Sequence, residues 1–391
     1  MKKVYNLPIY IILFSLFTLQ TLASEFNSVN NKFAHKIFNI AEKKGNENII
    51  ISPYSITLAT LMTIIGSSGT TEAEFLNKLE ISDQSKLLSS IKNQLKDKSE
   101  SLKVANALFQ LGMSPLESYK SAVSNYFDAE YFSTANIDII NDWVESKTNG
   151  KIKELLNNLP ANSTLAILNA VYFKESWADK FNKKDTFNGK FYLPGQKSLP
   201  IKMMRRKGKV SVLNKKDYSV LELPFQNKRF SFIVFLPNSQ NKFAPMKEEI
   251  SKLKFEEIKR ELEQKRKKDY TINIPRFELE TQTDLMPIFK ELGIKEAFEW
   301  QKADFTKMFA VKKGDVRIGK IVHKSYLKID EEGGEAAGAT AIVMQLKCMP
   351  ERLNYFIADH PFVFYIVDNK YNSIIFIGQL VKPEIKNSNK K

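Results

Sequence analysis

The chain has 391 residues and a formal net charge of +15, and 43% of its residues are apolar, which is ample for a sizeable core. Its single cysteine, Cys348, excludes an intramolecular disulfide and a zinc cluster built on thiolates. Stability must therefore come from packing.

The N-terminal stretch predicts a secretory signal peptide over residues 1–23. Two lysines precede an apolar run from Ile9 to Leu19, and the small residue Ala23 is a cleavage point. We therefore expect export, to the extracellular space or, in a bacterium, to the periplasm or cell surface. The alternative is an uncleaved membrane anchor, because Leu7 to Ala23 is only just short of a bilayer span. After cleavage we expect no membrane association.

Apolar spacing predicts alternating helices and strands through the first half of the chain. In order, they are a helix over Phe26–Lys44, a buried strand within Asn48–Ile56 that leads into an apolar helix ending near Gly66, helices over Glu72–Leu79 and Gln84–Lys98, a strand over Ser101–Gln110, and a helix over Ile137–Leu159 broken at Gly150. Leu165–Phe173 is continuously apolar except for Asn169, which predicts a strand buried on both faces.

The second half gives a comparable mixture. The predicted elements are paired strands over Tyr218–Pro224 and Arg229–Pro237, a charged surface helix over Phe243–Lys268, a strand over Tyr270–Leu279, a helix over Leu285–Leu292, a strand over Val316–Ile329, and a hairpin of Phe362–Val367 with Ser373–Leu380. No repeat or linker divides the chain. We expect one mixed domain over residues 24–385 and a frayed basic tail over 386–391.

The stretch from Ile329 to Pro350 has an unusual composition. Eleven consecutive residues, Ala336–Leu346, carry no charge. As a strand they would present one face of small and then apolar side chains, suited to burial. Glycines at 333, 334 and 338 weaken it as a permanent strand, because glycine loses the most backbone entropy on ordering. We therefore expect a segment with two states.

This combination resembles the reactive-centre loop of the serpins, serine protease inhibitors that trap a protease by inserting a cleaved loop into a central sheet. The hinge from Glu331 to Thr340 and the run His360 to Phe364 carry the resemblance, which covers nearly the whole mature chain. It implies an α+β serpin fold, one domain with a large central sheet, surrounding helices and an exposed loop over about 331–352. The hinge and inserting residues would be Glu331, Gly333, Gly334, Glu335, Ala336, Ala337, Gly338, Ala339 and Thr340. Inhibitory members usually carry Thr or Ser where Gly334 stands, and we expect insertion to survive this change.

The resemblance also implies a gate for opening the sheet. In serpins the matching histidine hydrogen-bonds the matching asparagine near the start of a buried helix, which assigns His323, Asn169, Ser52 and Ser55 to this gate. Trp177 would lie where the loop first enters the sheet. By its position in a strand alone, His323 is a core histidine rather than a catalyst. Such a buried polar network makes a good latch because it is costly to leave half satisfied.

The reactive bond follows from the family's spacing. It usually lies sixteen residues after the first Glu of the hinge, which from Glu331 gives Lys347, with cleavage before Cys348. Lysine fits the acidic specificity pocket of trypsin-like proteases. An offset of one residue would instead place Leu346 or Cys348 at the bond and change the class of target.

Two basic clusters have two interpretations. The first contains Arg205, Arg206 and Lys207, and the second contains Lys265, Arg266, Lys267 and Lys268. They are either a solvated surface or a site for a polyanion. For an exported protein, a glycosaminoglycan or an acidic cell-surface polymer fits better than nucleic acid.

Enzyme motifs are missing from the sequence. There are three histidines, and no Gly-x-Ser-x-Gly, His-Glu-x-x-His or Walker motif occurs. Cys348 could pair with a histidine as a nucleophile, but its surroundings match no thiol-protease signature and a flexible loop preorganises catalysis poorly. We therefore expect that the protein is not an enzyme and that it binds no cofactor and no metal.

Three functions remain. The first is a secreted, monomeric suicide inhibitor that forms a covalent complex with a trypsin-like protease. The second is a noninhibitory serpin that acts as a ligand carrier or chaperone, and the third is a polyanion-binding surface protein. The small residues of the hinge favour the first function.

Overall fold

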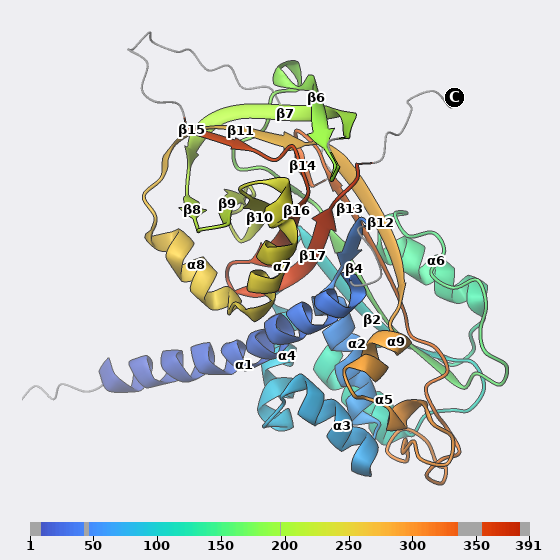
Figure 1. Cartoon of the computed structure of the whole chain (residues 1–391). Coiled ribbons are helices and arrows are strands. Elements are labelled where there is room, and N and C mark those ends of the chain that lie inside the picture. The colour runs from blue at the N-terminus through green and yellow to red at the C-terminus, as the bar shows by residue number, and fades with distance from the viewer. Residues whose placement is uncertain (1–8, 43–46, 196, 335–353, 384–391) are drawn as a thin grey trace, which may run out of the picture.

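The computed structural model describes residues 9–42, 47–195, 197–334 and 354–383, with side chains from residue 25 onward (Figure 1). The hinge residues from 335 to 340, the bond between Lys347 and Cys348, and the tail 386–391 lie outside the described residues. Helix α1 (Ile9–Glu42) runs through Ala23 without a break. The cleavage of a signal peptide over 1–23 therefore stays a prediction.

The most deeply buried sheet has six strands. Its order is β1 (Ile49–Ile51), β17 (Ser373–Leu380), β16 (Phe362–Asp368), β10 (Phe230–Pro237), β9 (Tyr218–Pro224) and β8 (Val212–Asn214). Every residue of β10, β16 and β17 is buried. The predicted terminal hairpin and the predicted strand pair are both confirmed, and they lie side by side through the antiparallel pairing of β10 with β16.

A second sheet of four strands lies at the top of the view in Figure 1. Its order is β15 (Asn354–Ile357), β11 (Lys268–Pro275), β7 (Ser198–Val210) and β6 (Phe187–Tyr192). β15 follows the undescribed segment directly. The predicted helix over Phe243–Lys268 is wrong at its end, because Lys268 is already the first residue of β11.

The central strands form separate groups. β2 (Leu102–Gln110) pairs with β3 (Glu130–Phe132) and along its whole length with β4 (Leu165–Phe173). β12 (Phe277–Asp284) pairs with β13 (Val322–Ile329), and two short strands, β5 (Glu175–Ser176) and β14 (Gly333–Gly334), form a third pair. Within the described ranges, the second edge of β4 and the second edge of β13 have no strand partner. The prediction that Leu165–Phe173 is buried on both faces is therefore wrong, since most of its residues are only half-buried.

Nine helices surround these sheets among the described residues. They are α1, α2 (Pro53–Ile65), α3 (Gly69–Leu79), α4 (Gln84–Lys96), α5 (Glu117–Phe127), α6 (Ile137–Lys147), α7 (Phe243–Lys252), α8 (Phe255–Gln264) and α9 (Met286–Glu291). Short 3₁₀ turns occupy Lys183–Asp185, Gln240–Lys242 and Glu296–Phe298.

Two helix predictions need correction. α6 ends at Lys147, because Asn149 and Gly150 have left-handed backbones, and residues 152–159 continue without helix. The charged surface helix is two helices, α7 and α8, because Leu253 and Lys254 have extended backbones between them. β13 likewise begins at Val322 and not at Val316.

The core is organised around α2. The Ser52 hydroxyl accepts the Ser55 N–H and caps this helix, and Pro53 occupies its first turn, where a missing N–H costs nothing. Its side chains are almost all buried, including Leu58, Leu61 and Met62. A helix that is buried on nearly every side must be surrounded by other elements. α2 therefore lies inside the molecule, packed against the central strands.

Candidate functional site

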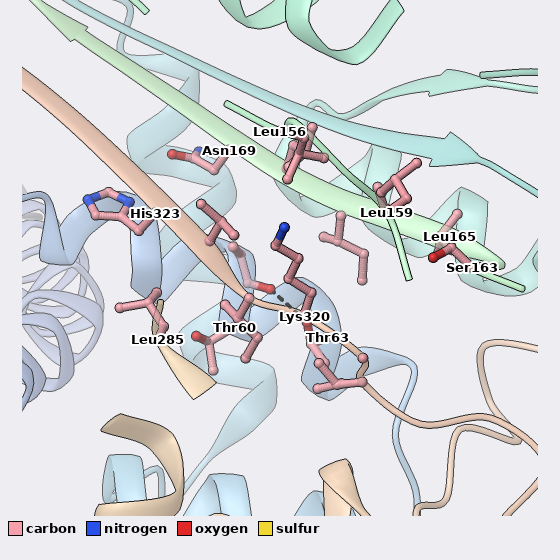
Figure 2. A pocket seen from close by; sticks show the side chains of 18 of the residues that line it. Thr60, Thr63, Leu156, Leu159, Ser163, Leu165, Asn169, Leu285, Lys320 and His323 are labelled. Carbon is pink, nitrogen blue, oxygen red and sulfur yellow. Dashed lines mark hydrogen bonds between the residues drawn. The ribbon is translucent and has the colours of Figure 1, made fainter. Parts of the chain in front are cut away.

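A cavity of about 470 Å³ lies between β4 and β13. Residues 165–171 of β4 and residues 322–325 of β13 line it, together with side chains from α2. Figure 2 shows Asn169 and His323, which come from the two facing strands, and Leu156, Leu159 and Leu165 at one side of the cavity. Two strand edges without partners on either side of a cavity are a template for one more strand.

The predicted gate residues gather at this cavity, but their hydrogen bonds differ from those expected. His323 does not bond to Asn169. Its Nε2 accepts the Ser52 backbone N–H at 3.0 Å and lies 2.6 Å from the Ser325 hydroxyl. The amide nitrogen of Asn169 donates instead to Asn106 Oδ1 at 2.6 Å, while its Oδ1 is buried without a partner in the described structure. The gate residues are thus brought together with one acceptor unsatisfied.

The charge state of His323 follows from these contacts. A ring nitrogen that accepts a backbone N–H cannot carry a proton, so the Ser325 hydroxyl must also donate to Nε2. Burial of the imidazole lowers the pKa of His323 from 6.5 to about 4. His323 is therefore a neutral acceptor that ties β13 to the start of α2.

Serines 52 and 55 connect this arrangement to its surroundings. The Ser52 hydroxyl donates to the Ile375 carbonyl of β17 at 2.8 Å. The Ser55 hydroxyl donates to the Asn169 carbonyl at 3.5 Å, a long contact from α2 to the unpaired strand β4. The start of α2 thus touches both sides of the cavity.

The first glycines of the hinge form the short strand β14, which pairs with β5. Gly333 pairs with Ser176 and Gly334 with Glu175 in antiparallel register. Gly333 has φ +143°, and a Cβ there would lie 2.2 Å from the Glu175 carbonyl oxygen, so only glycine fits. A Cβ on Gly334 would lie 3.4 Å from the Phe173 ring, an ordinary van der Waals distance. The position therefore accommodates a Cβ atom, as the Thr or Ser of inhibitory relatives would require.

Acidic side chains anchor the base of the hinge. Glu331 is 1% exposed, and its carboxylate accepts from Arg276 at 2.6 Å and from the Thr186 hydroxyl at 2.7 Å. The Glu332 carboxylate accepts from Lys180 at 2.8 Å, and this bond holds the pKa of Glu332 below its usual value. Both carboxylates are fixed at the start of the hinge.

Trp177 donates hydrogen bonds to the backbone of the same turn. Its indole Nε1 donates to the Asp330 carbonyl at 2.8 Å, and its backbone N–H donates to the Glu332 carbonyl at 2.8 Å. The ring is 2% exposed and stacks on Phe225 with centroids 4.7 Å apart. The predicted position of Trp177 beside the hinge agrees with these contacts.

Only part of the first basic cluster is exposed at the surface. Arg205 and Lys207 are exposed, but Arg206 points inward and is 8% exposed, 5.5 Å from the Phe181 ring. Burial lowers the pKa of the Arg206 guanidinium. The assignment of Arg206 to a polyanion site is therefore wrong, because its neighbours on β7 alternate sides and it lies on the core side.

The second basic cluster is fully exposed. Lys265, Arg266 and Lys267 follow α8, and Lys268 begins β11 opposite Val210 of β7. Of the second cluster only Lys268 lies on a strand, and the pairing of β7 with β11 places it on the neighbour of the strand that carries the first cluster.

Metal and membrane signals are missing from the described part of the chain. No group of three or more metal-ligating side chains occurs there. No described helix is long and apolar enough to cross a membrane.

The sequence did not reveal the partners of the hinge. Arg276 lies 55 residues from Glu331 in the chain, in the bend between β11 and β12, and Lys180 lies 152 residues from Glu332. Nothing in their local sequence distinguishes them from the many other cations. A buried glutamate demands a cation, but the sequence alone does not say that Glu331 is buried.

Known proteins match this chain almost from end to end. The family model described as Serpin (serine protease inhibitor) matches residues 28–383. Serpin B6 of Pongo abelii is 30% identical, over 90% of this chain and 98% of its own length. Leukocyte elastase inhibitor of Homo sapiens is 33% identical, over 92% of this chain and 100% of its own length.

Solved structures agree with these matches. Cleaved Serpin 42Da superposes with a TM-score of 0.83 at 24% identity, covering 93% of this chain and all of that one. Serpin48 of the insect Tenebrio molitor superposes with a TM-score of 0.80 at 26% identity, covering 92% of this chain and 98% of its own. The expected mixed fold of helices around a large sheet, in a single domain, is confirmed.

Proposed function

Because the chain belongs to the serpin family, we propose that it is an exported suicide-substrate inhibitor of trypsin-like serine proteases, cleaved between Lys347 and Cys348. The observation that carries this proposal is the cavity between the unpaired edges of β4 and β13, together with the pairing of the hinge to β5, the strand that follows β4 in the chain.

The register of the hinge supports insertion along this cavity. Gly334 faces Glu175, and the pairing is antiparallel, so each later residue of the loop would face one residue earlier in the chain. Thr340 would then face Asn169, and Lys347 would face Asn162. The segment from Gly334 to Lys347 is therefore long enough to fill the space beside the whole of β4.

The unsatisfied Asn169 fits the same register. Its Oδ1 is buried without a partner beside the cavity, and an inserted Thr340 would bring a hydroxyl donor to that position. Satisfying a buried acceptor contributes about 1–3 kcal/mol. Burial of Ile342 and Met344 on the inward face would add about 1.5–3 kcal/mol each.

The chemical step belongs to the target protease. Its serine oxygen attacks the Lys347 carbonyl carbon, and the bond to the Cys348 nitrogen breaks as that nitrogen takes a proton. The new bond is an ester between Lys347 and the protease. Cleavage frees the loop from β15, so that insertion carries the attached protease along before water hydrolyses the ester. Lys347 matches the acidic pocket of trypsin-like enzymes.

Incubation with trypsin tests the proposal. We expect a complex that survives hot detergent, and a released peptide whose mass corresponds to a start at Cys348. Lys347→Glu should abolish the complex, while Lys307→Glu, a change at an exposed ion pair with Glu72, should leave it intact. Clean cleavage without a complex would favour a noninhibitory carrier or chaperone instead.

A second protease resolves the position of the bond. A relative of this chain is named as an inhibitor of leukocyte elastase, and Leu346 or Cys348 at the bond would suit an enzyme of different specificity. Complex formation with elastase but not with trypsin would contradict the assignment of Lys347 to the reactive bond, while the proposed suicide-inhibitor mechanism would stand.

We also propose a polyanion site on the exposed basic residues Arg205, Lys207 and Lys265 to Lys268. Arg205 and Lys207 lie on β7, Lys268 begins the neighbouring strand β11, and Lys265 to Lys267 directly precede it, which supports this proposal. Heparin should bind with an affinity that falls as salt rises, and replacing the four residues 265–268 by Gln should flatten that dependence.

A further inference from the structure

The cavity continues past the start of β4 and has a distinct wall there, which we call the Arg317 end. Its lining side chains are Leu111, Met113, Leu159, Trp300, Arg317 and Ile318. The Leu111 N–H donates to the carbonyl of Thr164, the residue before β4, which places this wall beyond the strand. The Arg317 end is thus mostly apolar, with one guanidinium.

Arg317 is incompletely bonded. Its Nη1 makes only two long contacts of 3.4 Å, to the carbonyls of Phe298 and Ile318. Its Nε is buried and has no partner, and no carboxylate of the described residues lies within ion-pair distance. A desolvated donor on a cation is costly to leave unsatisfied. This arrangement calls for an anionic acceptor.

Trp300 covers the guanidinium on one side. Its ring centroid lies 4.8 Å from Arg317 Cζ, and its side chain is 59% exposed, the most exposed of the large apolar side chains described. Stacking on an aromatic ring fixes the plane of a guanidinium and leaves its edge free for a carboxylate. Trp300 therefore orients Arg317 and presents apolar surface beside it.

The other charges at the cavity do not neutralise Arg317. Lys320 donates to Asn158 Oδ1 at 2.7 Å and has no carboxylate partner among the described residues, and Figure 2 shows its side chain extending across the cavity. Lys324 is paired with Glu280 at 2.8 Å. Asp315, the one acid in the lining, is exposed and accepts the Lys312 N–H at 2.9 Å. The net charge of the side chains that line the cavity is therefore positive.

We propose that this cavity binds a fatty acid, with the carboxylate on Arg317 and the alkyl chain along the apolar wall between β4 and β13. The Arg317 guanidinium has no carboxylate partner among the described residues and lies at one end of a largely apolar space, which matches a ligand with one anionic head and one apolar tail. The volume of 470 Å³ lies within the range of about 300–1,000 Å³ typical of small-ligand sites. This inference goes beyond protease inhibition and stands without it.

Calorimetric titration of the full chain with laurate, and with dodecanol as the uncharged match, tests the site. Laurate should bind saturably to one site. Arg317→Gln should weaken laurate about tenfold or more and leave dodecanol unchanged, because only the charged hydrogen bonds are lost. Arg260→Gln, at an exposed arginine of α8, should change neither affinity. The absence of saturable binding, or equal laurate affinity in Arg317→Gln, would overturn the proposal.

A fluorescence measurement on protein with Arg317 intact covers the case in which that variant does not fold. Laurate should quench tryptophan emission in the unchanged chain, and Trp300→Phe, which leaves Trp143 and Trp177 in place, should remove most of that quenching. Undiminished quenching in Trp300→Phe would place the ligand elsewhere and overturn the site.

Discussion

Two adjacent glycines of the hinge have different physical requirements. Gly333 has a backbone conformation that other residues rarely adopt, and a side chain there would collide with the backbone of β5. Gly334 has no such restriction in the structure, although it is the residue that departs from the family pattern.

We predict that Gly333→Ala destabilises the uncleaved protein by about 1–3 kcal/mol or more, whereas Gly334→Thr is tolerated. Thermal unfolding of the two variants measures the difference. Gly334→Thr should also raise the number of protease molecules trapped per inhibitor cleaved, because a less flexible hinge enters the sheet sooner. Equal stability of both variants would contradict the geometry of the β5–β14 pair.

His323 should make stability depend on pH. The folded pKa of about 4 lies below the ordinary 6.5, so the unfolded chain binds the extra proton between these values. Stability from this residue is therefore full above about pH 6.5 and is lost as the pH falls toward 4, by a few kcal/mol at most. His35, whose pKa burial also lowers to about 4, adds to the same trend.

The comparison to make is His323→Gln, because a glutamine oxygen can still accept the Ser52 N–H. Urea midpoints measured at pH 7 and pH 5 should differ less in this variant than in the unchanged protein. An identical loss of stability in both proteins would assign the pH dependence to other groups.

At the scale of the elements, the turn between β13 and β14 is held by the ion pair of Glu331 with Arg276. Removing one partner of a buried pair costs more than removing both, because a charge is left without compensation. Arg276 is partly exposed, which reduces this cost.

We therefore predict that Arg276→Ala lowers the unfolding temperature of the uncleaved protein, and that adding Glu331→Gln restores part of the loss. Among the described residues, the buried Glu331 would otherwise keep only Thr186 as a side-chain partner. Thermal unfolding of the two single variants and the double variant forms the cycle. Additive losses would mean that the two side chains do not interact.

Sequence patterns predicted the elements whose surroundings are uniform. The strands around Phe232 and Phe364 are buried on both faces, and apart from Ser231 and Asp368 their sequences are apolar throughout. β6 and β7 were not predicted, because basic residues on the outer face of β7 and the buried Arg206 obscure the alternation. The break at Leu253 has neither glycine nor proline to mark it.

The site could be predicted only in part. The resemblance to serpins drew attention to Ser52, Ser55, Asn169 and His323, which do line one cavity. The expected bond between Asn169 and His323 is missing because β4 and β13 are separated by that cavity, a distance that no sequence pattern reports. Nothing in the sequence distinguished Arg317 from the other cations. Its lack of a carboxylate partner among the described residues is a property of the folded structure, which no sequence pattern reports.

At the scale of the whole molecule, the proposed trap requires an arrangement that is better packed than the one described. Inserting the loop would pair both open edges and fill the cavity, so the uncleaved form would be held by a kinetic barrier. We predict that cutting the bond after Lys347 raises the unfolding temperature sharply. Calorimetry before and after cleavage of the loop by a metalloprotease measures this change, because such an enzyme forms no ester with the chain and releases the cleaved protein.

An unchanged unfolding temperature after a verified single cut would mean that no more stable arrangement exists, and the trap would be excluded. Glu331→Pro, which places proline beside the short β5–β14 pair and removes a buried charge, offers a control in which the cut should have less effect. A protease that cuts only outside residues 335–353 should not raise the temperature.

The unpaired edges of β4 and β13 do not distinguish their own chain from a neighbour's. A segment of matching alternation from a second molecule could occupy the same slot, and its own slot would stay vacant for a third. Such a head-to-tail contact does not close on itself, so it propagates as a linear polymer. The feature that stores energy for one turnover would therefore also limit how concentrated and how warm the protein can be kept before it assembles into filaments.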